Sequence, residues 1–508
     1  MAGYGGVSRL RYARLLLLRN WLFCTAFALG LAMRVVTMAG FPPAIWFGGD
    51  SASYLSTALR LSPGTSRQSG YGILLFALRP GHSFLVVTAV QHLMGLAIAV
   101  MLYALLRRYG LPRWGATLAA LPVLLDAYQI QLEQEILASA AFGFLVVAAL
   151  TLLLWWRNGR PLWATAAAAL LLGCAATLWP VGLPLLILAV LYLIIRRAGW
   201  RALTATLAAG GLPLVMYLGW FDSTYHKVAF NFSDGVFLWS RTMTFADCAI
   251  IKPPADEAKL CPRVPVAARP AASIFIWEKN SPLDSLPGGK FSPGKNALAM
   301  NFAFRAIAAQ PAAYVKDVLD DFALTFTWNR PPHPSAQYRD RYQFSYATSN
   351  WAGPGTARSL AREQRRYTGG SLAATRATAP FAGWMRFYQR FAYIRGTMLA
   401  VVLLIGLAAI ARSWTSGGPG RRRGQGNRGN RDDWGGPALF PWVTAMAMLL
   451  MPNVTADFSE RYVVPALPVA CLAAAFAFLP RRALLPPEPG PVTSGAQEPP
   501  VTETAPLA

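Results

Sequence analysis

Charge is scarce in this sequence, and the scarcity excludes an ordinary soluble fold. Of its 508 residues 14% are charged, whereas about 25% are charged in an average soluble protein. The chain is 55% hydrophobic and its mean hydropathy is +0.36. Several apolar runs approach the roughly 20 residues that cross a bilayer as a helix. The composition therefore predicts an all-α, polytopic membrane protein.

Residues that commonly bind metals are also scarce, with four histidines and five cysteines. The sequence has no Cys-x-x-Cys pair and no Cys/His spacing that is typical of zinc. Cys24, Cys174 and Cys471 lie in apolar runs, where a free thiol packs as a small hydrophobic side chain. Cys248 and Cys261 lie in a long polar segment, and we predict a disulfide between them, with two free thiols as the alternative.

Acidic residues are outnumbered by basic ones, 23 to 47, which gives a net charge of +24. Nucleic-acid binding would be one explanation, but the placement of the basic residues argues against it. They gather in short segments between apolar runs, the pattern that marks cytoplasmic loops in contact with anionic lipid head groups. These segments are the N-terminus and those with Arg107, Arg108 and Arg113, Arg157 and Arg160, Arg196, Arg197 and Arg201, the stretch from Arg412 to Arg431, and Arg481 and Arg482. We therefore predict no nucleic-acid partner.

Ten membrane spans are predicted, with the N-terminus on the cytoplasmic side. The first apolar run follows basic residues as in a signal peptide, but no small-residue cleavage site follows it convincingly, so we expect a retained span. Trp179 and Pro180 leave open a single broken helix in place of the fifth and sixth spans. The spans are expected at residues 20–40, 82–106, 113–128, 136–156, 161–178, 180–195, 202–220, 392–411, 437–451 and 461–479.

Alternation of these spans divides the chain into five parts. They are a basic cytoplasmic N-terminus (1–19), a membrane bundle (20–220) with a long first outer loop (41–81), an extracytoplasmic segment (221–391), C-terminal spans (392–479) around a cytoplasmic Arg/Gly-rich loop (412–436), and a disordered cytoplasmic tail (480–508). The extracytoplasmic segment is expected to be mixed or irregular, with helices at 296–309 and 312–327, packed on the outer face. No convincing internal repeat is found.

The first candidate functional site lies at residues 47–54, shortly after the first span. Gly48 and Gly49 precede Asp50 here, and such glycines let the backbone approach a ligand closely. An ionisable group at a membrane boundary indicates a functional site. Asp is also a favoured N-cap, so a capping role for Asp50 stays open beside a catalytic one.

The first outer loop carries an excess of positive charge. Arg60, Arg67 and Arg79 accompany the single acid Asp50, and the planar guanidinium suits phosphate. For each arginine, anchoring to lipid head groups is the alternative. A stripe that is expected to lie along the membrane surface consists of Tyr54, Leu55, Ala58, Leu59 and Leu61.

Further polar residues lie at the edges of other spans. Glu133 and Glu135, with Asp126, form either a solvated outer loop or a second carboxylate for the Asp50 site. Arg461, at the start of the last span, either snorkels to the interface or reaches a phosphate in a cavity shared with Asp50. Within the second span, helix–helix hydrogen bonds are expected, rather than a ligand site, for Gln91 and His92.

Three features in this order resemble the GT-C membrane glycosyltransferases, which include the protein mannosyltransferases and the aminoarabinose transferases of lipid A. They are an aspartate after the first span with an amphipathic helix and a Gly70-Tyr71 turn, an acidic loop between the third and fourth spans, and an Arg461-Tyr462 pair that enters the last span. The resemblance covers residues 20–220 and 392–479. The chain departs from the usual pattern by Ser51 in place of a second acid, Gly72 in place of proline and Trp179 in place of arginine.

The resemblance implies a GT-C-like bundle in which Asp50 is the catalytic residue and the donor is a polyprenyl-phosphate-linked sugar. Asp50 would act as general base, without a covalent intermediate and therefore with inversion at the anomeric carbon. The donor phosphate would be held by Arg60, Arg67, Arg79 and Arg461. The substrate pocket would be lined by Tyr54, Tyr71 and Tyr462.

The partners expected are this donor, a protein, lipid or glycan acceptor of the cell envelope, and membrane lipids. The expected location is the plasma membrane, with the site facing outside. No cofactor is certain, and a divalent metal has no clear ligand site. A transporter or flippase of polyprenyl-linked lipid and a non-enzymatic membrane scaffold are the alternatives. Transporters commonly show inverted repeats, and none is found here.

Overall fold

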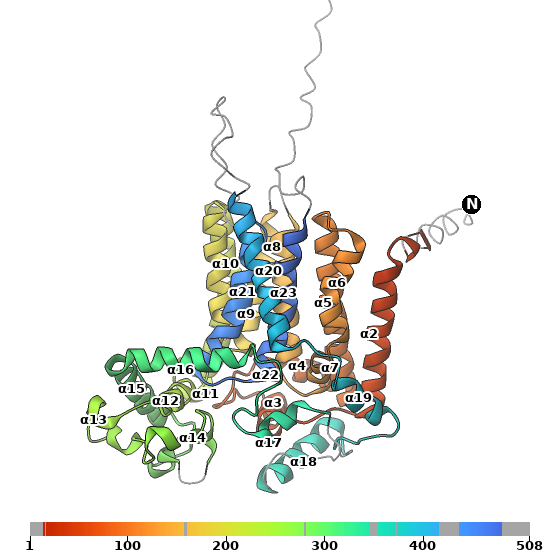
Figure 1. Cartoon of the computed structure of the whole chain (residues 1–508). Helices are drawn as coiled ribbons and strands as arrows, with labels where there is room; N and C mark the ends of the chain where they lie inside the picture. The colour runs from red at the N-terminus through yellow and green to blue at the C-terminus, as the bar shows by residue number, and fades with distance from the viewer. Residues whose placement is uncertain are drawn as a thin grey trace, which may run out of the picture.

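The chain folds into an upright bundle of apolar helices above a lower layer of shorter helices, as seen in a computed structural model (Figure 1). The structure describes residues 14–15, 17–156, 160–278, 281–344, 354–371, 373–415 and 436–479. Within these ranges no strand occurs, and the one isolated bridge joins Ile45 and Glu135. Predictions for residues 1–13, for Arg157, for the loop 416–435 and for the tail 480–508 lie outside the described residues.

Each of the ten predicted spans coincides with an apolar helix of the bundle. In the described part of the chain, five helices are long and apolar enough to cross a membrane, and five further apolar helices are shorter. They are α2 (Trp21–Gly40), α5 (Phe84–Arg108), α6 (Arg113–Leu125), α8 (Ser139–Trp155), α9 (Leu162–Leu178), α10 (Gly182–Ile195), α11 (Trp200–Tyr225), α20 (Gly396–Thr415), α21 (Leu439–Thr455) and the segment Glu460–Phe478, formed by α22 (Glu460–Val463), η7 (Val464–Ala466), α23 (Leu467–Ala475) and η8 (Phe476–Phe478). Because α9 and α10 are separate helices that pack together, the broken-helix alternative is wrong. The chain is a polytopic membrane protein.

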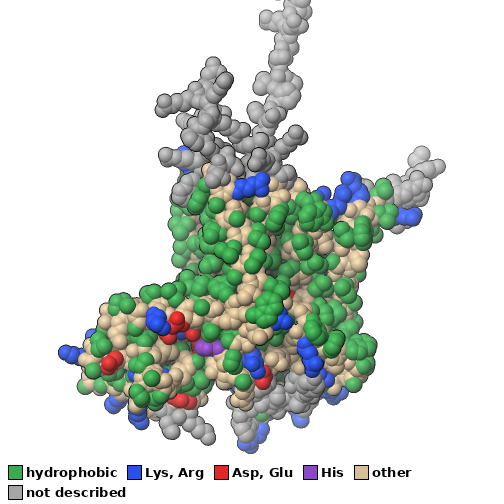
Figure 2. All heavy atoms as spheres, viewed as in Figure 1, with side chains coloured by type: hydrophobic (Ala, Val, Ile, Leu, Met, Phe, Trp, Pro, Cys, Tyr) green, Lys and Arg blue, Asp and Glu red, His purple; other side chains and the backbone are tan. Residues whose placement is uncertain are grey.

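The two ends of the bundle differ in what they carry. At the upper end α5 finishes in Arg107 and Arg108, and α6 begins at Arg113. The lower layer covers the opposite end, and between them the visible face is a belt of hydrophobic and other uncharged side chains (Figure 2). The basic loops and the lower layer are thus segregated to opposite ends.

The lower layer contains both predicted helices and several short ones. The predicted pair is α15 (Pro293–Ala309) and α16 (Pro311–Leu324). Residues between 236 and 306 enclose a hydrophobic core of their own, around Trp239 and Phe302. The other elements of this layer are α3 (Gly48–Arg60), α4 (Gly70–Leu78), η1 (Arg79–Gly81), α7 (Ala127–Gln134), α12 (Asp234–Thr242), α13 (Cys248–Ile251), η2 (Glu257–Leu260), η3 (Val266–Ala268), α14 (Ile274–Trp277), η4 (Pro282–Ser285), α17 (Ala336–Arg339), η5 (Asp340–Tyr342), α18 (Pro354–Thr368) and α19 (Phe381–Gln389).

Candidate active site

Asp50 lies in the first turn of α3, where the helix dipole favours a negative charge. The helix begins at Gly48, whose φ of 50° suits glycine. Its N-cap is Phe47, whose N–H donates to Ser51 Oγ at 2.8 Å, and Ser51 donates in turn to the carbonyl of Ile136 at 2.9 Å. The N-cap interpretation of Asp50 is therefore wrong, because α3 starts before it and the carboxylate contacts other side chains.

The apolar stripe of α3 packs inside the protein. Tyr54, Leu55 and Ala58 are at most 3% exposed, covered by α4 and α18, whereas Leu61 is 49% exposed. The predicted position along the membrane surface is therefore wrong for the first three. Covering this stripe with protein fixes α3, and with it Asp50, against the bundle.

The predicted Gly70-Tyr71 turn is the first turn of α4. A Cβ on Gly70 would lie 2.4 Å from Thr177 Oγ1, and a Cβ on Gly72 would lie 2.6 Å from Thr57 Cγ2. Both contacts are too short for any larger residue. The glycines therefore let α4 approach both α3 and the end of α9.

Two arginines from distant parts of the chain hold the Asp50 carboxylate. Arg67 Nε and Nη2 lie 3.1 and 3.0 Å from Asp50 Oδ1, and Arg461 Nη1 contacts Asp50 Oδ2. The side chains of Asp50, Arg67 and Arg461 are 13%, 18% and 10% exposed. Burial disfavours the carboxylate, but the two guanidinium groups outweigh it and lower the pKa of Asp50 to about 2. In this arrangement Asp50 is a firmly held anion and a weak base.

Of the three tyrosines predicted to line a pocket, Tyr54 and Tyr462 lie beside this ion-pair site, and Tyr71 packs on Tyr54. Burial and the Asp50 carboxylate raise the pKa of Tyr54. Its ring meets that of Tyr71 edge-on, with 5.0 Å between the centroids. Arg461 Nη2 donates to the hydroxyl of Tyr462 at 3.0 Å. The structure thus brings these side chains to one place from α3, α4 and the last span.

The other two predicted phosphate ligands do not contact Asp50. Arg60 ends α3, ten residues after Asp50, which is about 15 Å along a helix axis. It is 63% exposed and lies 3.3 Å from Glu363 of α18. Arg79 begins η1, the turn that leads towards α5. Of the four arginines, only Arg67 and Arg461 pair with Asp50 in the described part of the chain.

The acidic connection between α6 and α8 is buried, so its interpretation as a solvated loop is wrong. Asp126 is 3% exposed, and Glu133 and Glu135 are fully buried. Asp126 caps α7, accepting hydrogen bonds from the N–H groups of Tyr128 and Gln129 at 2.9 and 3.1 Å. The short helix α7 therefore runs through the protein interior.

Glu133, a candidate second acid, is held by groups of the bundle. Arg34 of α2 donates to both of its carboxylate oxygens at 2.8 and 2.9 Å, and His92 Nδ1 lies 2.8 Å from one of them. Gln91 donates to the backbone carbonyls of Glu133 and Glu135, at 2.8 Å each. Gln91 and His92 thus form interhelical hydrogen bonds, as the sequence predicts.

Glu135, the other candidate acid, lies beside the Asp50 loop. The carbonyl of the next residue, Ile136, accepts the hydrogen bond from Ser51. Glu135 Oε1 accepts from Gln131 at 2.9 Å. Burial raises the pKa of Glu135 to about 8, so its carboxyl is mostly protonated at neutral pH. Within the described residues no ion pair or hydrogen bond joins it to Asp50.

Arg461 and two acids near it carry buried groups without a hydrogen-bond partner. These groups are Arg461 Nε, Glu460 Oε1 and Glu135 Oε2, none of which has a partner among the described residues. Arg461 also lies close enough to influence the ionisation of Glu135. Buried polar groups are normally paired. The combination of an unpartnered guanidinium N–H with unpartnered carboxyl oxygens on Glu460 and Glu135 therefore suits a polar ligand.

Arg330 is a residue of this region that the sequence motifs do not predict. Its guanidinium carbon lies 3.3 Å from the centre of the Tyr128 ring, and its Nη1 lies 2.5 Å from Glu460. The signal available in the sequence is a basic residue before a proline-rich stretch, Arg330-Pro331-Pro332-His333-Pro334.

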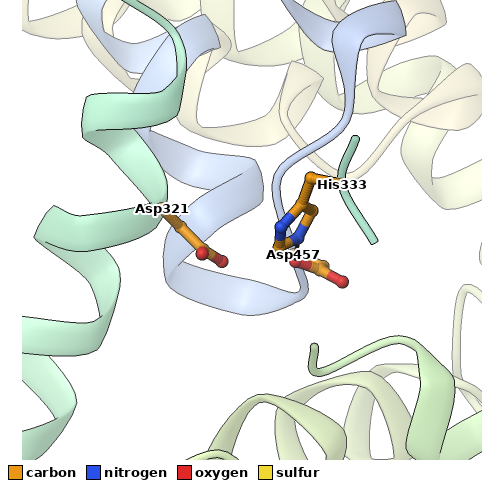
Figure 3. A group of neighbouring side chains, drawn as sticks. All are labelled: Asp321, His333 and Asp457. Atoms are coloured by element: carbon orange, nitrogen blue, oxygen red, sulfur yellow. Dashed lines mark hydrogen bonds and ion pairs between the residues drawn. The ribbon is translucent and has the colours of Figure 1, made fainter. Parts of the chain in front are cut away.

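Asp321, His333 and Asp457 form the one group of potential metal ligands in the described part of the chain, with ligand atoms within 4.8 Å of one another (Figure 3). Each already has a protein partner. His333 Nε2 lies 2.5 Å from Asp457 Oδ1, Asp321 pairs with Arg241, and the N–H of Ser273 donates to Asp457 Oδ2 at 2.9 Å. Burial disfavours the charged imidazole, but the carboxylates outweigh it and raise the pKa of His333. The group therefore fits a network of charge pairs, and Asp50 lies outside it.

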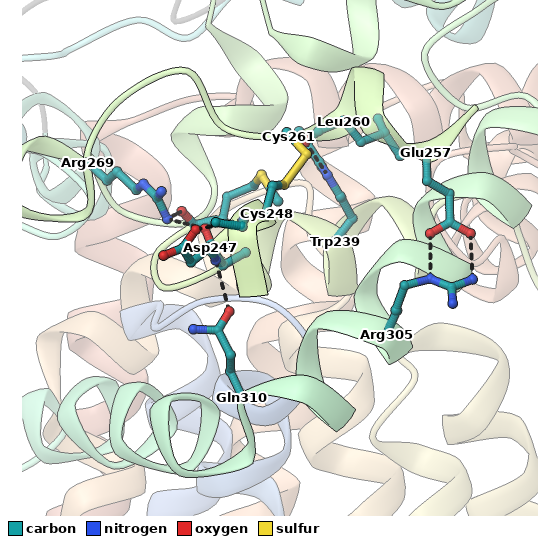
Figure 4. The surroundings of a disulfide bond; sticks show 12 residues. Trp239, Asp247, Cys248, Glu257, Leu260, Cys261, Arg269, Arg305 and Gln310 are labelled. Carbon is teal, nitrogen blue, oxygen red and sulfur yellow. Dashed lines mark hydrogen bonds and ion pairs between the residues drawn. A yellow bond between two sulfur atoms is a disulfide. The ribbon is translucent and has the colours of Figure 1, made fainter. Parts of the chain in front are cut away.

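Cys248 and Cys261 are joined by a disulfide in the lower layer (Figure 4). Trp239 Nε1 donates to the carbonyl of Leu260 at 3.2 Å beside the bridge. The bridge closes the loop between α13 and η2 next to the core of the lower layer.

No family model and no curated protein matches the sequence. Solved structures of membrane glycosyltransferases are similar to it at low identity. The Saccharomyces cerevisiae protein O-mannosyltransferase Pmt1-Pmt2 complex, bound to the sugar donor, is 16% identical with a TM-score of 0.33, over 46% of this chain and 38% of that one. ArnT from Cupriavidus metallidurans, in the apo state, is 12% identical with a TM-score of 0.34, over 89% of this chain and 76% of that one.

A third similar structure is the Archaeoglobus fulgidus oligosaccharyltransferase AglB, in complex with an inhibitory peptide and a dolichol-phosphate. It is 14% identical with a TM-score of 0.40, over 90% of this chain and 49% of that one. The chain thus spans about half the length of the oligosaccharyltransferase and less than half of the mannosyltransferase. At these identities and TM-scores, a catalytic role has to rest on residues of this chain.

Proposed function

We propose that the chain is a membrane glycosyltransferase that moves a sugar from a polyprenyl-phosphate donor to an acceptor of the cell envelope. The observation that carries the proposal is the Asp50 carboxylate, buried between Arg67 and Arg461 near the end of the bundle. Two arginines around a buried anion supply the charge-assisted donors that a phosphate needs. A carboxylate at the same place supplies a proton acceptor.

The donor phosphate and Asp50 compete for the same guanidinium groups. When a phosphate binds Arg67 and Arg461, the carboxylate loses the contacts that lower its pKa. Its pKa then rises, and it becomes a stronger base beside the bound donor. Donor binding thereby activates Asp50. The unpaired Nε of Arg461 is a further donor for the phosphate.

The reaction follows from these roles. The oxygen of an acceptor hydroxyl attacks the anomeric carbon of the sugar and forms the new glycosidic bond. The bond from that carbon to the phosphate oxygen breaks, and its electron pair leaves with the phosphate, whose charge Arg67 and Arg461 stabilise. Asp50 takes the proton of the hydroxyl. A single displacement without a covalent intermediate inverts the anomeric centre.

The membrane is needed because the prenyl chain of the donor stays in lipid while its phosphate reaches the end of the bundle. The basic loops lie at the opposite end from Asp50. Under the positive-inside rule those loops are cytoplasmic. The site then faces outside, at the surface of the plasma membrane.

The test uses cells that lack the protein, complemented with the wild type, Asp50→Asn or the control Asp284→Asn. Asp284 lies in η4 of the lower layer and its side chain is 45% exposed. Mass spectrometry of lipid-linked sugars and envelope glycans should show donor accumulation and product loss in the deletion and Asp50→Asn strains alone. Normal glycans in the Asp50→Asn strain, at normal protein level, would contradict the proposal. Product loss in the deletion strain alone would instead point to a transporter.

A further inference from the structure

The segment before the last span is attached to the lower layer at successive residues. Asp457 contacts His333 and accepts from the N–H of Ser273. The hydroxyl of Ser459 lies 3.0 Å from that of Tyr342. Glu460 pairs with Arg330, and the next residue, Arg461, reaches Asp50. The side chain placed against Asp50 thus follows directly after anchored residues.

The two basic partners come from one proline-rich stretch, residues 330–334, which we name the proline clasp. Arg330 lies 2.5 Å from Glu460, and His333 lies 2.5 Å from Asp457. The two bases are three residues apart in the sequence, and so are the two acids, but the first base contacts the second acid. The clasp and the segment 457–460 therefore run antiparallel. Pro331, Pro332 and Pro334 restrict the backbone angles between and after the two bases. The clasp therefore presents its bases at a fixed spacing.

Both pairs of the clasp are largely removed from solvent. The side chains of Arg330 and Glu460 are 15% and 4% exposed, and those of His333 and Asp457 are 17% and 9% exposed. The Arg330 guanidinium also lies on the Tyr128 ring of α7. Charges of this kind are held in place more firmly than exposed ion pairs.

We propose that Arg330 and His333 are positioning residues that set the direction of Arg461 towards Asp50 and the donor phosphate. Successive residues of an α-helix differ by about 100° around its axis. Because Arg330 fixes the direction of Glu460 at the start of α22, it also fixes the direction of Arg461. The inference rests on the proposed function, in which Arg461 binds the phosphate of the donor.

The test is a double-mutant cycle on the full chain in lipid nanodiscs, with a polyprenyl monophosphate as the probe. Arg330→Gln is expected to weaken binding about tenfold in the wild-type background and to have almost no effect in the Arg461→Gln background. A residue that acts through Arg461 has nothing left to position once Arg461 is gone. A merely structural role would weaken binding equally in both backgrounds, and that additive result would overturn the proposal.

Further variants separate positioning from folding. Arg330→Lys retains the charge opposite Glu460 and is expected to recover most of the affinity. If Arg330→Gln fails to fold, His333→Gln breaks the second pair and is expected to show the same dependence on Arg461; equal losses in both backgrounds would overturn the proposal again. Arg305→Gln is the control for the loss of an ion pair elsewhere in the lower layer, because it breaks the pair of Arg305, whose side chain is 44% exposed, with Glu257 (Figure 4). If the single variant Arg461→Gln binds the lipid phosphate normally, the proposed function is contradicted as well. If the losses of affinity from Arg330→Gln and Arg461→Gln are additive, only the positioning role of the clasp is contradicted.

Discussion

Two of the buried arginine–carboxylate sites, that of Arg34 with Glu133 and that of Arg461 with Asp50, differ in how many N–H groups of the guanidinium have a partner. Arg34 makes five hydrogen bonds, two to Glu133 and three to the carbonyls of Gly30, Val123 and Leu124. A guanidinium has five N–H donors, so none is left for a ligand. The Arg34 site is therefore a structural junction between α2, α6 and α7.

In the Arg461 site, part of the hydrogen-bonding capacity of the guanidinium is not used. Arg461 contacts Asp50 and the hydroxyl of Tyr462, while its Nε has no hydrogen-bond partner among the residues that the structure describes. The unpartnered carboxyl oxygens Glu460 Oε1 and Glu135 Oε2 belong to residues near Arg461. Burial and ion pairing alone therefore do not distinguish an arginine that binds a ligand from a structural one.

Breaking the Arg34 site should have the largest effect on stability. Arg34→Gln leaves the Glu133 charge buried without its main partner, and we expect it to lower the free energy of unfolding by about 3–5 kcal/mol. Denaturant unfolding of the purified protein in detergent measures this loss. As a control, Arg34→Met combined with Glu133→Met should be less destabilising than Arg34→Gln, because no charge is left behind. Wild-type stability in Arg34→Gln would remove the distinction between the two sites.

Breaking the Arg461 site should affect ligand binding more than folding. We expect Arg461→Gln and Arg67→Gln each to weaken binding of a polyprenyl monophosphate about 10- to 100-fold, because each removes hydrogen bonds between charged groups. Titration of nanodiscs with the lipid, alongside a thermal unfolding scan, separates the two effects. A large loss of stability with unchanged binding by the folded fraction would make Arg461 a second structural arginine.

The acids of the Asp50 region should show opposite dependences of stability on pH. The folded-state pKa of Glu135 is raised from 4.5 to about 8. The contribution of the Glu135 carboxyl to folding stability is therefore fully present below about pH 4.5 and is lost as the pH rises towards 8. The folded-state pKa of Asp50 is lowered from 3.8 to about 2, so its contribution is lost only as the pH falls below about 4. Melting temperatures between pH 5 and 8 should fall for the wild type and fall less for Glu135→Gln; parallel curves would show that Glu135 is ionised in the folded protein.

Substitution of Arg60, the exposed arginine of the first outer loop, should have the smallest effect on stability and phosphate binding. Arg60 is 63% exposed in its pair with Glu363, and such pairs contribute less than about 1 kcal/mol. We expect Arg60→Gln to leave both the unfolding midpoint and phosphate binding near wild-type values. Weakened binding in this variant would return Arg60 to the phosphate ligands predicted from the sequence.

The sequence predicts the membrane spans and the place of Asp50 because both depend on local pattern. Apolar runs and basic loops are visible in any single stretch, and the bundle follows them. The partners of the acids are not local. Arg34 lies inside an apolar run and meets Glu133 from 99 residues away, so Glu133 appears unpaired in the sequence. Arg60 and Arg67 share a loop, but only the fold decides which of them faces Asp50.

In the proposed function, Asp50 occupies the position of the donor phosphate until the donor binds. Measuring how tightly Asp50→Asn binds a polyprenyl monophosphate in nanodiscs tests this competition. Because the carboxylate competes with the phosphate for Arg67 and Arg461, the neutral variant should bind the lipid phosphate more tightly than the wild type does, while sugar transfer is lost. Weaker binding by Asp50→Asn would mean that the carboxylate helps to hold the phosphate, and would contradict the account.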